Sequence, residues 1–272
     1  AVALFTLAAT KENSFAAFAL GKLYLAGDAA LPRDPAAALK WLTYAAELGN
    51  QFAQYRLGKL LLKGDDGIPK DVITAIRWLT AAAKQENGYA EYALALVYLT
   101  GEDAPKDSVK ALSLLKRSAG RGNQFAQYRL GKLLLQGEDA PKDVKAAIRW
   151  LTAAAEQGNQ YAQYALGKLY LLGKEVPKDR SSAIKWFQLA ADQGNEYAQY
   201  FLKHMDDRLG QPPVAAVISL FHHLANIFQE QNQPPPSGGV RVAVDRKLLR
   251  KIKAKKIAQG HKADDHEPEM QL

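Results

Sequence analysis

The feature that most constrains this chain is an internal repeat of 36 or 37 residues. The segment Asn-Gln-Phe-Ala-Gln-Tyr-Arg-Leu-Gly-Lys-Leu begins at Asn50 and recurs unchanged from Asn123. Close variants begin at Asn13, Asn87, Asn159 and Asn195. The two longer spacings come from the loops 27–34 and 64–71, which each contain one residue more than the corresponding loops of the other units. A period of this length, with insertions in loops, is typical of stacked helical units, so we predict an all-α fold.

Each unit shows the pattern of two helices. The first, at 52–63 in one unit, has apolar residues at helical spacing and stops before Gly64. A Pro-Lys/Arg-Asp turn follows, and its aspartate is suited to accept a backbone N–H as the N-cap of the second helix. That helix, at 144–157 in another unit, ends before Gly158, a residue that commonly closes helices. The predicted capping aspartates are Asp34, Asp71, Asp107, Asp143 and Asp179.

Small residues and aromatic residues also recur with the period. Glycine inside a helix costs about 1 kcal/mol relative to alanine, so its recurrence predicts that another helix crosses very close by. These glycines are Gly21, Gly58, Gly131 and Gly167. We interpret the recurring aromatic residues as core residues and not as a ligand site, because they repeat with the fold: Phe18, Tyr55, Tyr92, Tyr128, Tyr164 and Tyr200 on the first helix, and Trp41, Trp78, Trp150 and Trp186 on the second. The third unit departs from the pattern at Ala95, Leu96 and Leu114.

The motifs Ala-Gln-Tyr-x-Leu-Gly-Lys-Leu-Tyr, Gly-x-x-x-Pro-Lys-Asp, Lys-Trp and Ala-Ala-x-x-Gly-Asn resemble the Sel1-like repeat, a relative of the tetratricopeptide repeat. The resemblance covers residues 1–208, about five and a half repeats. It implies a right-handed αα superhelix, a solenoid of antiparallel helix pairs whose concave face binds a protein partner. Residues 3–13 match the second helix of a unit, so we expect the chain to be an N-terminally truncated fragment of a longer protein.

The repeat pattern fades after Leu202, and the composition then changes twice. Residues 209–231 contain an apolar segment that we predict to be a helix capping the end of the solenoid. Residues 232–240 have the Pro/Gly composition of a linker. Residues 241–272 form a tail, predicted to be helical or disordered, that begins with a dense run of cations: Arg241, Arg246, Lys247, Arg250, Lys251, Lys253, Lys255 and Lys256.

The segment Leu-Phe-His-His-Leu-Ala-Asn-Ile-Phe and the tail from Asp245 to His266 resemble the C-terminal end of plasmid mobilisation proteins (relaxases) of gut Firmicutes. Several of those proteins carry Sel1-like repeats after a nuclease domain. The resemblance implies that this chain is the non-catalytic region of such a protein, with the nuclease domain upstream of Ala1. The alternative is that the chain is a general bacterial Sel1-like adaptor in signalling or complex assembly, with no nucleic-acid role.

The formal net charge of +8 favours acidic partners. The cations of the tail are suited to contact the phosphates of nucleic acid, and membrane-surface binding is less favoured because the apolar edge of the tail is narrow. Within the repeats, cations recur at one position of the first helix. They predict either a protein-binding face or a solvated surface that keeps the fold soluble, and with two neighbouring arginines they comprise Lys22, Lys59, Lys132, Lys168, Arg56 and Arg129.

The composition excludes several classes of site. There is no cysteine, which excludes a disulfide scaffold, a cysteine-ligated zinc site and a cysteine nucleophile. The histidines lack metal-ligand spacing, so we expect no metal, no cofactor, no catalytic residues and no small-molecule substrate. No apolar run is long enough to span a membrane. We expect a bacterial cytoplasmic protein, although a signal peptide upstream of Ala1 stays compatible with the sequence.

Overall fold

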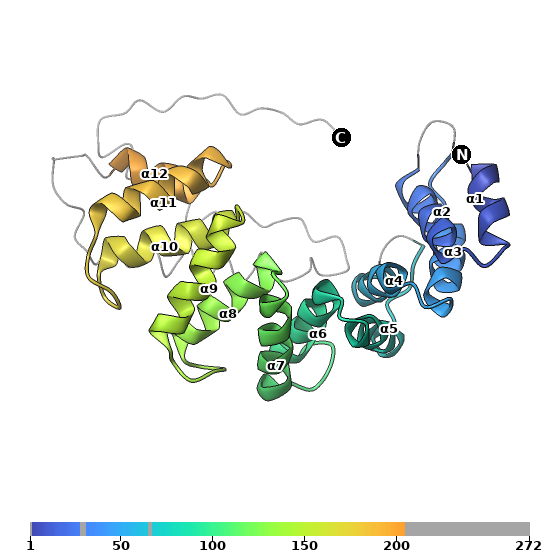
Figure 1. Ribbon diagram of the computed structural model, residues 1–272, viewed down its shortest axis with the longest axis horizontal. Coiled ribbons are helices and arrows are strands. Elements are labelled where there is room, and N and C mark those ends of the chain that lie inside the picture. Colours follow the sequence, from blue (N-terminus) through green and yellow to red (C-terminus); the bar gives the residue numbers. More distant parts are fainter. Residues whose placement is uncertain (1, 28–30, 65–66, 205–272) are drawn as a thin grey trace, which may run out of the picture. The chain divides into compact units, whose positions relative to one another are not determined.

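The computed structural model describes residues 2–27, 31–64 and 67–204, which contain twelve α-helices and no β-strand. All of these helices belong to one compact unit, residues 1–210. Each helix packs mainly against the helices that precede and follow it in the chain (Figure 1). The predicted all-α solenoid is confirmed for these residues. The predicted capping helix (209–231), linker (232–240) and basic tail (241–272) lie outside them.

Two kinds of helix alternate along the chain. We call the first helix of each repeat the A helix: α2 (Ser14–Ala26), α4 (Gln51–Lys63), α6 (Gly88–Thr100), α8 (Gln124–Gln136), α10 (Gln160–Leu172) and α12 (Glu196–His204). The second is the B helix: α1 (Val2–Ala9), α3 (Pro35–Glu47), α5 (Val72–Lys84), α7 (Ser108–Gly120), α9 (Val144–Glu156) and α11 (Arg180–Asp192). Repeats 1 to 5 are the pairs α2–α3, α4–α5, α6–α7, α8–α9 and α10–α11.

The N-terminal ends of α2 to α12 are fixed by side-chain caps. Each predicted aspartate caps a B helix by accepting the backbone N–H three residues later. Asn13, Asn50 and their counterparts in the later repeats cap the A helices in the same way. At Asp179, hydrogen bonds from Ser182 and Ser181 hold the pKa of the carboxyl at about 2, well below its usual value. The sequence therefore sets where each helix begins through short-range hydrogen bonds.

The N-cap at α9 offers a direct test of this local stabilisation. The Asp143 carboxylate accepts the Ala146 N–H at 2.9 Å. Asp143→Ala should lower the free energy of unfolding by about 1 kcal/mol, measured by urea denaturation, because that N–H loses its partner. Asp143→Asn is the matched control and should retain most of the stability, since asparagine caps equally well. Equal losses in both variants would contradict the capping role.

The helix glycines lie where an A helix and its B helix approach most closely. A Cβ atom built on Gly131 would lie 2.7 Å from Leu151 Cγ, and one on Gly58 would lie 2.7 Å from Leu79 Cγ. The same clash arises between Gly21 and Leu42 and between Gly167 and Phe187. These distances confirm the close crossing that the recurring glycines predict. In repeat 3, Ala95 takes the glycine position and is fully buried.

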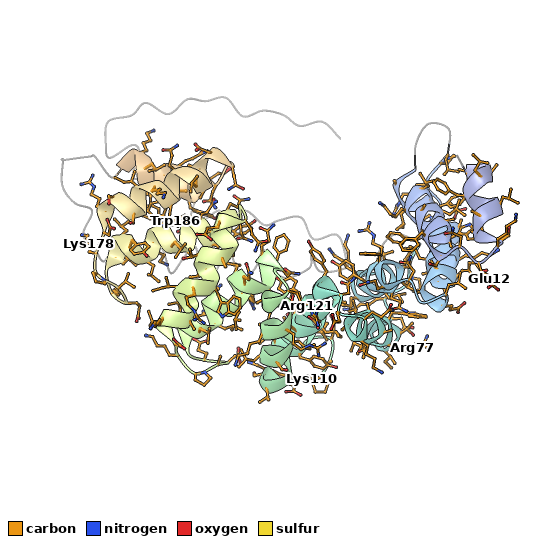
Figure 2. All side chains as sticks on the ribbon, in the orientation of Figure 1. Glu12, Arg77, Lys110, Arg121, Lys178 and Trp186 are labelled. Atoms are coloured by element: carbon orange, nitrogen blue, oxygen red, sulfur yellow. The ribbon has the colours of Figure 1, made fainter. Side chains whose placement is uncertain are left out.

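The interpretation of the aromatic residues as core residues is only partly correct. The largest fully buried side chains of the B helices are those that follow the tryptophan position: Leu42, Leu79, Leu115, Leu151 and Phe187. The tryptophans are half-buried; Trp186, for example, packs on the cluster formed by Leu151, Ala162 and Leu166 (Figure 2). Tyr200 is exposed, whereas the adjacent Phe201 is buried. Leucine and small residues fill the centre of most helix pairs, so the tryptophan rings lie at its edge, whereas in repeat 5 the ring of Phe187 lies at the centre.

Candidate functional site

The A helices carry a continuous series of aromatic side chains that we call the aromatic ladder. It joins residues at the second and fifth positions of the A helices. Ring centroids lie 5.9–6.4 Å apart in pairs between successive A helices: Phe18–Phe52, Tyr55–Tyr89, Tyr92–Phe125, Tyr128–Tyr161 and Tyr164–Tyr197. One ring pair thus joins each A helix to the next, from α2 to α12.

The second-position rings are the outward part of the ladder. Tyr89 is 54% exposed and Phe52 is 48% exposed, and Phe15, Phe125 and Tyr161 are exposed as well. The fifth-position rings of α2, α4, α6, α8 and α10 are half-buried, whereas Tyr200 of α12 is exposed. Burial raises the pKa of the Tyr128 hydroxyl to about 12. Large contiguous apolar surfaces that stay exposed in a folded unit commonly mark binding sites. The sequence contained this signal in the aromatic residue that recurs two positions after each capping asparagine, and the sequence-based candidates omitted it.

The predicted basic residues lie on the same face of the A helices as the ladder. In α4, Phe52, Tyr55, Arg56 and Lys59 stand at positions i, i+3, i+4 and i+7, which share one helix face. α8 repeats this arrangement. In α2, Lys22 Nζ lies 5.8 Å from the centre of the Phe18 ring. The structure therefore places the predicted cations beside aromatic rings, and their role in binding stays a proposal.

The cations of repeats 4 and 5 are close enough to affect one another. Burial, together with the positive charge of Arg129, lowers the pKa of Lys132. Burial lowers the pKa of Lys168 as well, with contributions from Lys132 and Lys174. The Arg129 Nε atom is buried and has no hydrogen-bond partner among the described residues. Arg56, Lys59 and Lys22 are more exposed, so the face is partly desolvated in repeats 4 and 5 and open in repeats 1 and 2.

A ladder of glutamines joins neighbouring repeats beneath this face. In α4, Gln54 Nε2 donates to the Ala46 carbonyl of α3 at 3.0 Å, and Gln54 Oε1 accepts from Gln85 at 2.9 Å. The corresponding bonds recur at Gln127 and Gln163. Each such glutamine therefore connects the C-terminal ends of two B helices, one from the preceding repeat and one from its own.

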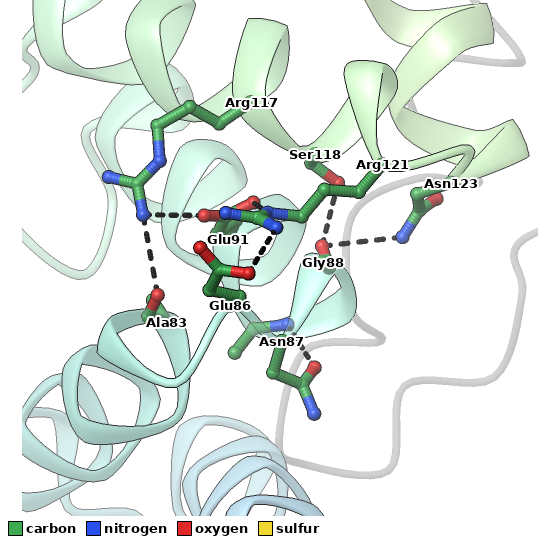
Figure 3. A network of polar contacts seen from close by, with 10 residues as sticks. Ala83, Glu86, Asn87, Gly88, Glu91, Arg117, Ser118, Arg121 and Asn123 are labelled. Atoms are coloured by element: carbon green, nitrogen blue, oxygen red, sulfur yellow. Dashed lines mark hydrogen bonds and ion pairs between the residues drawn. The ribbon is translucent and has the colours of Figure 1, made fainter.

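Repeat 3 replaces the glutamine pair by an ion-pair network (Figure 3). Glu91 takes the glutamine position and is fully buried; its carboxylate oxygens lie 2.5 Å from Arg117 Nη2 and 3.3 Å from Arg121 Nε, although neither contact has the alignment of a hydrogen bond. Arg121 stands where Gln85 stands in repeat 2 and also pairs with Glu86 at 2.9 Å. A carboxylate has no N–H for the Ala83 carbonyl, and Arg117 Nη2 donates to it at 3.3 Å. The three substitutions thus restore the connection between repeats 2 and 3.

The described residues contain neither a metal-binding group nor a membrane-spanning helix. Within residues 2–27, 31–64 and 67–204, no group of three His, Asp or Glu side chains is arranged to hold a metal ion. None of the helices in these ranges combines the length and the apolar character needed to cross a bilayer. The predicted tail cations, from Arg241 to Lys256, lie outside the described residues.

Comparison with known proteins assigns the repeats. The model of the Sel1 repeat matches residues 14–50, 51–87, 88–123, 124–159 and 160–195. The chain belongs to the Sel1 repeat family. The boundaries agree with the helix pairs of repeats 1 to 5, since each matched segment begins at the first residue of an A helix. No curated protein matches the chain.

Two solved structures are similar to these Sel1 repeats. One is c5321, described as a protective antigen present in uropathogenic Escherichia coli strains; it shares 34% identity at a TM-score of 0.68 over 77% of this chain and 45% of its own. The other is a Sel1 repeat protein from Oxalobacter formigenes, with 34% identity and a TM-score of 0.68 over 75% of this chain and 59% of its own. The chain therefore spans about half the length of these relatives.

Proposed function

We propose that this Sel1 repeat chain is a protein-interaction scaffold that holds its partner on the aromatic ladder of the A helices. The observation that carries the proposal is that a ring pair joins each A helix to the next, from Phe18–Phe52 to Tyr164–Tyr197, and that the outward rings are about half exposed. Aromatic side chains provide much of the binding energy in protein interfaces because they are large and rigid. The described side chains of this face are aromatic or cationic, and such a surface is suited to binding a partner and not to catalysis.

Site-specific photo-crosslinking of the full chain in its source cells tests the proposal. A photoreactive phenylalanine at Tyr89 or Tyr161 should capture a partner protein that is absent when the same group replaces Ile73. Ile73 is the matched control because it is an apolar residue, 85% exposed, on the B helix α5. Equal capture at Ile73, or no capture at either ladder position, would show that the ladder is not the binding face.

We propose a second role for the tail, supported by its sequence. Residues 241–257 contain eight Lys or Arg residues against one acid, Asp245, directly after a linker composition. Such a segment is suited to salt-sensitive, sequence-independent contacts with phosphates. Together with the resemblance to mobilisation proteins, this supports a scaffold in a DNA-transfer complex, whereas a general adaptor needs no nucleic acid.

Binding of a labelled DNA duplex distinguishes these alternatives. The full chain should bind it with an affinity that falls steeply with salt, and replacing the eight tail cations by glutamine should remove most of that binding while leaving the helical circular dichroism spectrum unchanged. Unchanged DNA binding after the replacement would contradict the tail role. Absence of DNA binding by the unaltered chain would favour the general adaptor.

A further inference from the structure

The cations beside the aromatic ladder have an uneven distribution that distinguishes the repeats. Repeats 2 and 4 each carry an arginine and a lysine, Arg56 with Lys59 and Arg129 with Lys132. Repeat 3, which lies between them, has Ala93 and Leu96 at these two positions. The ladder therefore presents two basic segments separated by an apolar one.

The face contains little negative charge of its own. Helices α2, α4, α8 and α10 contain no acidic residue. The one acid of α6, Glu91, is buried and paired with Arg117 and Arg121. Among the described residues, no carboxylate lies within ion-pair distance of Arg56, Lys59, Arg129 or Lys132, whereas the loop cations Lys70, Lys106 and Lys142 each pair with an acid of the following loop. Among the described residues, the basic segments therefore have no acidic counterpart.

We infer that the ladder binds an extended acidic peptide segment of a partner protein. Its carboxylates lie over repeats 2 and 4, and its apolar or aromatic residues cross repeat 3. This inference rests on the proposed function and names the chemistry of the partner. Arginine recognises carboxylates through directed, charge-assisted hydrogen bonds, and the exposed Arg56 of α4 can make them with a partner.

The arrangement of the helices sets the spacing within that segment. α4 contacts α6, and ring contacts join α6 to α8, so the two basic segments are two helix-to-helix steps apart. Packed helices lie about 8–10 Å apart and an extended chain advances about 3.3 Å per residue, so roughly six residues separate the two acidic clusters.

Two synthetic peptides of identical composition test the register. The split peptide has a triplet of glutamates at each end of about six Ala, Leu and Tyr residues, and the block peptide has all its glutamates together. The protein is the full chain with the eight tail cations replaced by glutamine, so that the tail cannot bind the peptides. We expect the split peptide to bind at least about tenfold more tightly than the block peptide by fluorescence anisotropy, and less tightly as salt is added.

Variants of the face identify the site. Lys59→Glu combined with Lys132→Glu should weaken binding of the split peptide at least about tenfold, because two attractive contacts become repulsive. Lys116→Glu with Lys145→Glu is the matched control, since both lysines are exposed on B helices, and should change binding less than about twofold. Ala93→Arg with Leu96→Lys gives repeat 3 the cations of its neighbours and should abolish the preference for the split peptide. Circular dichroism confirms that each variant is folded.

Three results would overturn the inference: equal binding of the two peptides, equal losses in the face and control variants, or competition by oligothymidylate as strong as that by the split peptide, which would indicate a nucleic-acid face. Failure of the acidic peptides combined with partner capture at Tyr89 would overturn the acidic partner and leave the scaffold function intact. Failure of capture at the ladder would overturn both.

Discussion

Combining Arg117→Ala with Arg121→Gln should lower the free energy of unfolding by about 3 kcal/mol, because it leaves the fully buried Glu91 carboxylate without an opposite charge. Removing one side of a buried ion pair costs much more than a surface pair contributes. Arg117→Ala also leaves the Ala83 carbonyl without its donor. Urea denaturation monitored by circular dichroism measures the loss.

Adding Glu91→Gln to the same variant provides the control that the chain itself suggests. The triple variant gives repeat 3 the glutamine pair of repeats 2, 4 and 5, in which Gln54 donates to a carbonyl of the preceding B helix and accepts from Gln85. It should recover most of the lost stability. A triple variant as unstable as the double variant would show that the cost arises from the arginine packing and not from the buried charge.

Gly131→Val should lower the free energy of unfolding by about 2–3 kcal/mol. The valine Cβ atom would lie 2.7 Å from Leu151 Cγ, and Leu151 is fully buried, so the two helices of repeat 4 must move apart. Gly131→Ala should lower the free energy of unfolding less than Gly131→Val. Alanine already occupies the corresponding position of repeat 3, as Ala95, and its helix propensity is better than that of glycine, which partly offsets the clash. Thermal or urea unfolding gives the comparison.

Gly120→Ala is the matched control for the glycine effect. Gly120 ends α7, and a Cβ atom added there would have no neighbour within 4 Å. The substitution should stabilise the protein by up to about 1 kcal/mol, because alanine favours the helix and restricts the unfolded chain. If Gly131→Val were as harmless as Gly120→Ala, the close approach of α8 and α9 would not depend on glycine.

The repeat by itself determined the fold to a large extent. The period, the Pro-Lys-Asp turns and the capping residues predict all the A and B helices of repeats 1 to 5, because caps and turns act within three or four residues of the chain. The recurring glycines also predict a close crossing. The sequence did not identify the atoms on the other side of that crossing, Leu42 opposite Gly21 and Leu151 opposite Gly131, because contacts between helices depend on the packing of the pair.

Only the tertiary structure decided which aromatic residues are buried and how repeat 3 is connected to repeat 2. Periodicity marks Tyr55 and Trp150 as structural but cannot rank their exposure, which depends on how the next repeat covers them. Glu86, Glu91, Arg117 and Arg121 look like ordinary surface charges in the sequence. They become one network because α6 and α7 bring residues about thirty positions apart to the same junction, where burial makes an unpaired charge costly and each substitution compensates another.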